Sequence, residues 1–270
     1  MFIESIIAEV KAKIIATLLN QGACPSMIES VVPILLCPKC SSELREERDH
    51  LICTQCGARY SIIDGRIIDF LGSDQGWVGL FERFPILYDP WSRVGWRLSG
   101  RGPLERFYEE LTKNLSGGIL VDAGCGTGSL LSLLERKQYR GSLIGIDISL
   151  PMLKIASRKT KEAVFLRASI DRIPIASGTI DHYISSLVIH IFKDKAKVIS
   201  EISRILKKGG SVRIAVATTD SIRGRIFNRL LAVHAVRTSD YISLFNVYGI
   251  EILRTVDFGT FKAFYGLLSH

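Results

Sequence analysis

The distribution of apolar and polar residues divides the chain into an amphipathic start, a short cysteine-containing stretch and a long remainder. From residue 2 to residue 19, apolar side chains recur at helical spacing with charged side chains between them. We expect an amphipathic helix there, ended by Gly22 and Pro25. This helix defines the first of four predicted units, residues 1–33.

The remainder of the chain predicts an α/β domain. From Gly118 onward, short apolar runs alternate with amphipathic segments, which is typical of a parallel sheet covered by helices. We therefore expect a doubly wound α/β domain over 118–270. Before it, residues 34–72 form the cysteine unit, and residues 73–117 combine aromatic and basic side chains with helical patches. We predict a helical lid or linker for 73–117, entered through turn-forming residues.

Four cysteines form two pairs with the spacing of metal ligands. The pairs are Cys37-Pro-Lys-Cys40 and Cys53-Thr-Gln-Cys56, and a hairpin between them can bring the pairs together. Four thiolates favour a closed tetrahedral Zn²⁺ site that holds the fold and leaves no position for a reactive water. His50 would be a fifth ligand, so we expect it at the surface.

The stretch from Leu36 to Gly65 resembles a known zinc ribbon. Besides the cysteines, the tail Tyr60-Ser-Ile-Ile-Asp-Gly65 is similar to the small activator subunit that partners several translation-related methyltransferases. In that family the ribbon docks on a methyltransferase. The resemblance leaves open whether this ribbon docks on the rest of its own chain or delivers a substrate.

A glycine-rich turn follows the first strand of the α/β unit. Residues 118–128 read Gly-Ile-Leu-Val-Asp-Ala-Gly-Cys-Gly-Thr-Gly, a buried strand that runs into a turn and opens a helix. A second strand, Ser142–Asp147, ends in a carboxylate that can accept both hydroxyls of a ribose. The turn alone is shared with dinucleotide-binding folds.

The order of motifs resembles class I S-adenosylmethionine-dependent methyltransferases, in particular the quinone and sterol type. The DxGCGTG strand and a strand ending in GxDxS are followed by a Met-Leu pair, and matching segments continue to Gly210. The resemblance implies a Rossmann-like, mostly parallel sheet of seven strands. It also implies S-adenosylmethionine as the methyl donor.

Residue roles carried over from this resemblance define a cofactor site. Asp122 would help to bind the methionine ammonium, Gly124 and Gly126 would form the turn against the methionine part, and Asp147 would bind the ribose. The other implied cofactor contacts are Ile148 and Met152 on the adenine faces, Ser169 and Ile170 near the adenine amino group, and Ser185. Ser169 replaces a frequent aspartate and Lys208 replaces a usual proline, so we expect reduced cofactor affinity.

Catalytic residues are harder to predict, because methyl transfer from a sulfonium depends largely on positioning. A base is needed only if the acceptor loses a proton. His190 is the candidate base, with packing as its alternative role. Tyr88 is a candidate for the acceptor pocket, because residues 81–89 resemble the helix that closes over the cofactor in small-molecule methyltransferases; an ordinary aromatic contact is the alternative.

Charge and cysteine content refine the expected partners and location. The net charge of +8 is concentrated beyond residue 150, where 19 basic and 9 acidic side chains occur. A basic C-terminal half of this kind attracts nucleic acid or an anionic membrane surface, although many basic proteins bind neither. The isolated Cys24 and Cys125 do not suggest disulfides, and charges interrupt every long apolar stretch. We expect a cytoplasmic protein.

Three functions remain open. A methyltransferase for a small-molecule or lipid-like acceptor is favoured by the segment ending at Tyr88 and by residues 220–248, where arginines interleave with apolar residues in the manner of a substrate lid. An RNA methyltransferase, acting on rRNA or tRNA, would use the ribbon and the basic half. A non-catalytic zinc-ribbon scaffold would not need the intact glycine turn.

Overall fold

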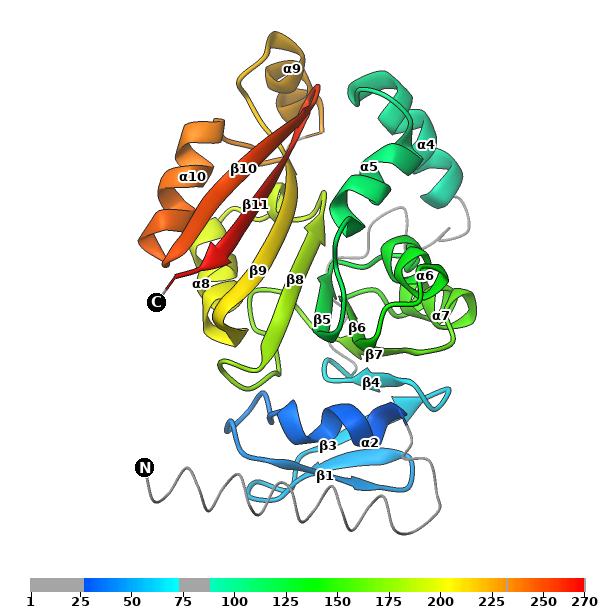
Figure 1. Ribbon diagram of the computed structural model, residues 1–270. Coiled ribbons are helices and arrows are strands. Elements are labelled where there is room, and N and C mark those ends of the chain that lie inside the picture. Colours follow the sequence, from blue (N-terminus) through cyan, green and yellow to red (C-terminus); the bar gives the residue numbers. More distant parts are fainter. Residues whose placement is uncertain (1–26, 73–87, 232, 270) are drawn as a thin grey trace.

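A single eleven-stranded sheet runs through the described part of the molecule (Figure 1). The computed structural model describes residues 27–72, 88–231 and 233–269, so the helix predicted over residues 2–19 lies outside the described residues. Within the described ranges, no helix has the length and apolar character needed to cross a membrane.

The sheet is formed by two groups of strands. The ribbon contributes β1 (Leu44–Glu47), β2 (His50–Cys53), β3 (Arg59–Ile63) and β4 (Ile67–Asp69). The α/β unit contributes β5 (Gly118–Ala123), β6 (Gly141–Asp147), β7 (Ala163–Arg167), β8 (Ile180–Ser186), β9 (Leu206–Ala217), β10 (Ile250–Phe258) and β11 (Phe261–Leu268). Their spatial order is β1-β2-β3-β4-β7-β6-β5-β8-β9-β11-β10.

The helices surround this sheet. They are α2 (Met27–Val31), α4 (Tyr88–Ser99), α5 (Leu104–Thr112), α6 (Ser129–Arg136), α7 (Leu150–Lys159), α8 (Lys195–Ile205), α9 (Ile222–Leu230) and α10 (Thr238–Val247), with 3-10 turns η1 (Val32–Ile34) and η3 (Ile189–Ile191). The predicted lid or linker thus contains α4 and α5.

The prediction of a Rossmann-like sheet is confirmed, but seven strands is too small a number. β7, β6, β5, β8 and β9 pair in parallel, and β11 and β10 complete the sheet antiparallel. Beyond β7, β4 adds in parallel with Ile67 opposite Phe165 and Asp69 opposite Arg167. The sheet therefore continues from the ribbon into the α/β unit, because the backbone edge of β7 accepts a further strand.

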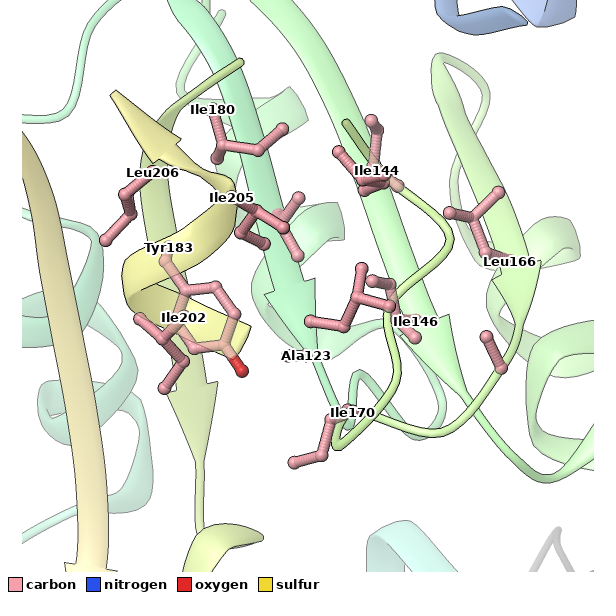
Figure 2. Packing of buried hydrophobic residues seen from close by; sticks show 14 of the residues in the cluster. Ala123, Ile144, Ile146, Leu166, Ile170, Ile180, Tyr183, Ile202, Ile205 and Leu206 are labelled. Atoms are coloured by element: carbon pink, nitrogen blue, oxygen red, sulfur yellow. The ribbon is translucent and has the colours of Figure 1, made fainter. Parts of the chain in front are cut away.

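Alternating side chains bury both faces of the central strands. Leu120 and Leu143 pack with α5, α6 and α7, whereas Val121 and Ile144 pack with α8, α10 and α2. Figure 2 shows the second group around Tyr183, with Ile202 and Ile205 from α8. Ribbon residues such as Leu51 belong to the same cluster. The ribbon therefore shares its core with the α/β unit.

Polar contacts also join the ribbon to the α/β unit. The Arg167 guanidinium forms a largely buried ion pair with Asp69 (3.0 Å) and donates to the carbonyl oxygens of Gly72 and Ile148. Arg172 donates to the carbonyl of Pro38, between the first two cysteines. These bonds tie the ribbon to the loops that follow β6 and β7.

Candidate cofactor and acceptor site

The glycine-rich turn after β5 is fixed against the neighbouring strand β6. The amides of Gly124 and Cys125 both donate to the carbonyl of Ile146, at 2.7 and 3.0 Å. Gly124 has φ 74°, and a Cβ there would lie 2.3 Å from the side chain of Val188. Only glycine meets both conditions. The turn thus leaves space for a ligand at the carboxyl ends of the parallel strands.

Asp122 is an unusual group at this turn. It lies one residue before the end of β5 and is only 1% exposed, and neither carboxylate oxygen has a hydrogen-bond partner among the described residues. Burial, reinforced by the charge of Asp147, raises the pKa of this carboxyl to about 7. A buried carboxyl without partners is costly unless a ligand supplies them, which is the arrangement expected for a group that receives a ligand cation.

Asp147 lies at the end of the adjacent strand, β6. Its carboxylate accepts from the amide of Gly126 at 2.9 Å and from the amide of Ser149 at 2.9 Å. Ser149 in turn caps the N-terminus of α7. These bonds hold the half-exposed Asp147 carboxylate beside the glycine turn, where a ribose ligand is expected.

Three residues predicted to surround the adenine lie on the elements that follow β6 and β7. Met152 on α7 and Ile170 after β7 are buried, and Ile148 is half-buried. The hydroxyl of Ser169 donates to Asp171, whose carboxylate pairs with Lys197 at 2.9 Å. The Ser169 hydroxyl is thus already engaged, so the amide of Ile170 remains the simpler contact for an adenine.

Ser185 and His190, two further predicted site residues, are engaged in the core. Ser185 is fully buried on β8 and donates to the carbonyl of Ala123 at 2.9 Å. The buried His190 accepts at Nδ1 from the amide of Ala217, and burial followed by the charge of Lys195 lowers its pKa to about 4. A neutral imidazole held in this way favours packing over catalysis as its role.

A cavity of about 220 Å³ opens beside Asp122 and Gly124. Its walls are largely apolar and aromatic, and its lining includes Trp96, Leu104, Tyr108, Leu130, Leu187, Phe227, Leu231 and Phe261. Trp96 stacks on Phe261, with 5.5 Å between the ring centroids. These aromatic residues were not predicted from the sequence, because they come from α4, α5, α9 and β11, which are far apart along the chain.

The segment ending at Tyr88 is only partly described. Tyr88 begins α4, but its side chain lies outside the described residues, so its predicted role stays a prediction. The next residue, Asp89, accepts from the hydroxyl of Thr127 at 2.6 Å and pairs with Lys159 at 2.8 Å. These bonds fasten the start of α4 to the glycine-rich turn.

The four cysteines come together as predicted. Their Sγ atoms all lie within 4.8 Å of one another, with Cys37 to Cys56 at 3.7 Å and Cys40 to Cys53 at 3.4 Å. The hydroxyl of Tyr60 lies 3.1 Å from the Cys37 sulfur. His50 is outside this cluster and contacts Asp49.

The fold and the glycine turn with its two strand-end carboxylates resemble those of class I S-adenosylmethionine-dependent methyltransferase domains. In agreement, residues 121–214 match the family model described as a methyltransferase domain. A chain from the complex between the Haloferax volcanii Trm112 methyltransferase activator and a methyltransferase superimposes with a TM-score of 0.58. It is 18% identical and covers 72% of this chain and 100% of its own.

Curated relatives carry different activities. The chain is 26% identical over 234 residues to the chloroplastic methyltransferase At2g41040 of Arabidopsis thaliana (74% of this chain, 66% of that protein). It is 30% identical over 146 residues to the ubiquinone/menaquinone biosynthesis C-methyltransferase UbiE of Syntrophotalea carbinolica (50% and 58%). It is 38% identical over 104 residues to an Arabidopsis thaliana tRNA (carboxymethyluridine(34)-5-O)-methyltransferase (37% and 24%). The chain thus spans between a quarter and two thirds of these relatives.

Replacing Asp122 with Asn should stabilise the cofactor-free protein by an amount that grows with pH. The folded-state pKa of about 7 exceeds the ordinary value of 3.8, so the native state retains a proton that the unfolded chain releases. The wild type therefore loses stability between these two pH values, by about 2–4 kcal/mol, whereas the Asn variant does not. Urea unfolding of both proteins at about pH 4.5 and pH 7.5 measures this. An equal difference at both pH values would contradict a buried, unpartnered carboxyl.

Proposed function

We propose that this chain binds S-adenosylmethionine and transfers its methyl group to a small-molecule or lipid-like acceptor. The observation that carries the proposal is Asp122, a buried carboxylate with two unpartnered oxygens at the cavity beside the glycine turn. The methionine ammonium of the cofactor would supply the missing hydrogen bonds and cationic charge. Binding it would also favour the ionised carboxylate.

The remaining donor contacts fit the same cofactor. The Asp147 carboxylate, held by two backbone amides, would accept the ribose hydroxyls, while Met152 and Ile148 would pack against the adenine. When bound, the cofactor supplies an electrophilic methyl group. The chain itself would mainly orient the acceptor and exclude water, so no protein base is required for a nucleophile that is already ionised and has no proton to lose.

The acceptor class is inferred from the cavity. Trp96, Phe227 and Phe261 form an aromatic wall that suits an apolar or conjugated molecule, and Gly124 places the donor turn in the same cavity. The relationship to a ubiquinone/menaquinone methyltransferase supports this class. Because His190 is buried and neutral, an acceptor that brings its own nucleophile fits better than one that needs this imidazole as a base.

An RNA acceptor is the second candidate, supported by the tRNA methyltransferase relative and by the basic C-terminal half. It is less favoured because the cavity walls are apolar and aromatic. In addition, the ribbon lies at the end of the molecule away from α9, which borders the cavity, and its strand β4 is paired within the sheet (Figure 1). This position does not favour a role of the ribbon in holding an RNA at the cavity.

For the ribbon, we propose a structural Zn²⁺ held by Cys37, Cys40, Cys53 and Cys56. Zinc–sulfur bonds of about 2.3 Å place tetrahedral sulfurs about 3.8 Å apart, close to the spacing here. The Tyr60 hydroxyl would donate to the Cys37 thiolate. We further propose that this ribbon takes in cis the place of a separate activator, a partner present in the complex of the Haloferax volcanii relative.

Methyl transfer can be tested with tritium-labelled S-adenosylmethionine and fractionated lipid, metabolite and RNA pools. We expect label in the lipid or small-molecule fraction, and loss of transfer in Asp147→Ala because the ribose loses a charged acceptor. Cofactor affinity in that variant should fall by about 1–3 kcal/mol, measured by calorimetry. Label confined to RNA would contradict the acceptor class, and unchanged affinity would contradict the donor site.

Zinc removal should weaken the whole described fold, because the ribbon and the α/β unit share one sheet and one core. The wild type should contain one zinc per chain, and the double variant Cys40→Ser, Cys53→Ser should contain none, by elemental analysis. Treating the wild type with a chelator should lower the midpoint of a single urea transition. Full zinc occupancy in the double variant, or unfolding of the ribbon alone, would count against this account.

A further inference from the structure

Helix α9 carries an apolar stripe on its outer surface. Ile222, Ile226 and Leu230 recur at every fourth position, and all three side chains are largely exposed. At about 100° per residue they span roughly 80° of the helix surface. About 100° around the helix from the middle of this stripe, Phe227 lines the cavity and packs edge-on against Phe261, with 5.5 Å between the ring centroids. The stripe therefore lies on a different face of α9 from the side chain that lines the cavity.

Arginines border this stripe on both sides. By the same helical geometry, Arg225 and Arg229 lie along one edge and Arg223 lies along the other, and all three are exposed. No acidic residue occurs in α9. A narrow apolar stripe bordered by long basic side chains is the pattern of a helix that lies in the plane of a membrane interface, where arginines reach the phosphates.

Helix α4 repeats the pattern across the cavity. Val94 and Leu98 are exposed one turn apart, and Arg93 and Arg97 are exposed beside them. The inner face of α4 supplies Trp96 to the cavity wall. Figure 1 shows α4 and α9 at the same end of the molecule, away from the ribbon. We call the exposed apolar and arginine residues of α4 and α9 the rim.

The charges of the rim are available for an anionic partner. None of its five arginines forms an ion pair with a residue in the described ranges. Three nearby carboxylates have partners already, while Glu105 and Glu109 line a pocket together with Arg93. Asp89 binds Lys159, Asp220 binds Thr238, and Asp257 binds Lys262. The rim therefore combines exposed aliphatic side chains with uncompensated positive charge around a cavity mouth.

We propose that the rim docks on an anionic lipid surface and so presents the cavity mouth to acceptors dissolved in the membrane. This inference rests on the proposed lipid-like acceptor. The aliphatic stripes of α4 and α9 would enter the acyl boundary while the arginines bind lipid phosphates. An apolar acceptor would then pass from the bilayer into the aromatic cavity without crossing water, and the polar cofactor would be held at the opposite, strand-end side.

Sedimentation of the full chain with lipid vesicles tests the docking surface without a methyl-transfer assay. We expect binding to phosphatidylcholine vesicles that contain phosphatidylglycerol, much weaker binding to phosphatidylcholine alone, and weakening by salt. Ile226→Glu with Leu230→Glu should reduce the affinity at least tenfold. Arg225→Gln with Arg229→Gln should reduce binding to the anionic vesicles by about 10- to 30-fold.

A matched control is available elsewhere on the surface. Val247 and Leu253 are 74% and 61% exposed, comparable to Leu230 and Ile226 at 79% and 60%, but belong to α10 and β10. Val247→Glu with Leu253→Glu introduces the same charge and should leave vesicle binding unchanged. Calorimetric cofactor binding in each variant checks that the fold and the donor site are intact.

The outcomes separate this proposal from the proposed function. If the rim and control variants lose vesicle binding equally, or if the wild type does not bind vesicles, docking is overturned. This holds even if the chain methylates a lipid-like acceptor in detergent. Salt-sensitive binding to total RNA, lost in the arginine variant and without vesicle binding, would overturn docking in favour of a nucleic-acid surface. Vesicle binding that depends on the rim would stand even if methyl transfer were not found.

Discussion

The site depends on two hydrogen bonds that pin the glycine-rich turn to β6. Because the amides of Gly124 and Cys125 share the Ile146 carbonyl, the turn cannot move away from the strand, and it brings Asp122 and Asp147 to neighbouring strand ends. Two nearby carboxylates in a poorly solvated place repel each other, which contributes to the raised pKa of Asp122. The cost is offset only when a cation arrives, so the same geometry that strains the cofactor-free protein favours a cationic cofactor.

Different parts of the sheet carry different functional regions of the molecule. At one end, β4 of the ribbon pairs with β7, and the ion pair between Arg167 and Asp69 joins the same two strands. The ribbon with its four-cysteine cluster therefore supports the loop after β7 that carries Ile170. At the other end, α4 and α9 enclose the cavity with their inner faces and expose aliphatic and basic side chains on their outer faces. In this account metal-dependent stability, donor binding and acceptor supply occupy separate parts of one continuous sheet.

Much of the central domain could be predicted from sequence, because the strand, glycine turn and second-strand acid are local patterns with a direct physical meaning. The four-cysteine cluster could likewise be predicted from the sequence. The continuation of the sheet into the ribbon was not, since β4 joins β7 through backbone bonds that no side-chain pattern records. Ser185 and His190 were predicted as site residues from their positions in motifs. A motif does not reveal that the hydroxyl of Ser185 and the imidazole of His190 already form hydrogen bonds with backbone groups. The aromatic cavity escaped prediction because Trp96, Phe227 and Phe261 meet only in the folded chain.

The most direct test of the central claim compares two ligands by calorimetry, S-adenosylhomocysteine and 5′-methylthioadenosine, which lacks the amino-acid part. Both should bind the wild type through the ribose and adenine contacts, but only the first carries an ammonium for Asp122. We predict that Asp122→Asn weakens S-adenosylhomocysteine binding by about 1–3 kcal/mol and leaves methylthioadenosine binding nearly unchanged. Equal effects on both ligands, or none on either, would contradict the assignment of this buried carboxylate to the cofactor.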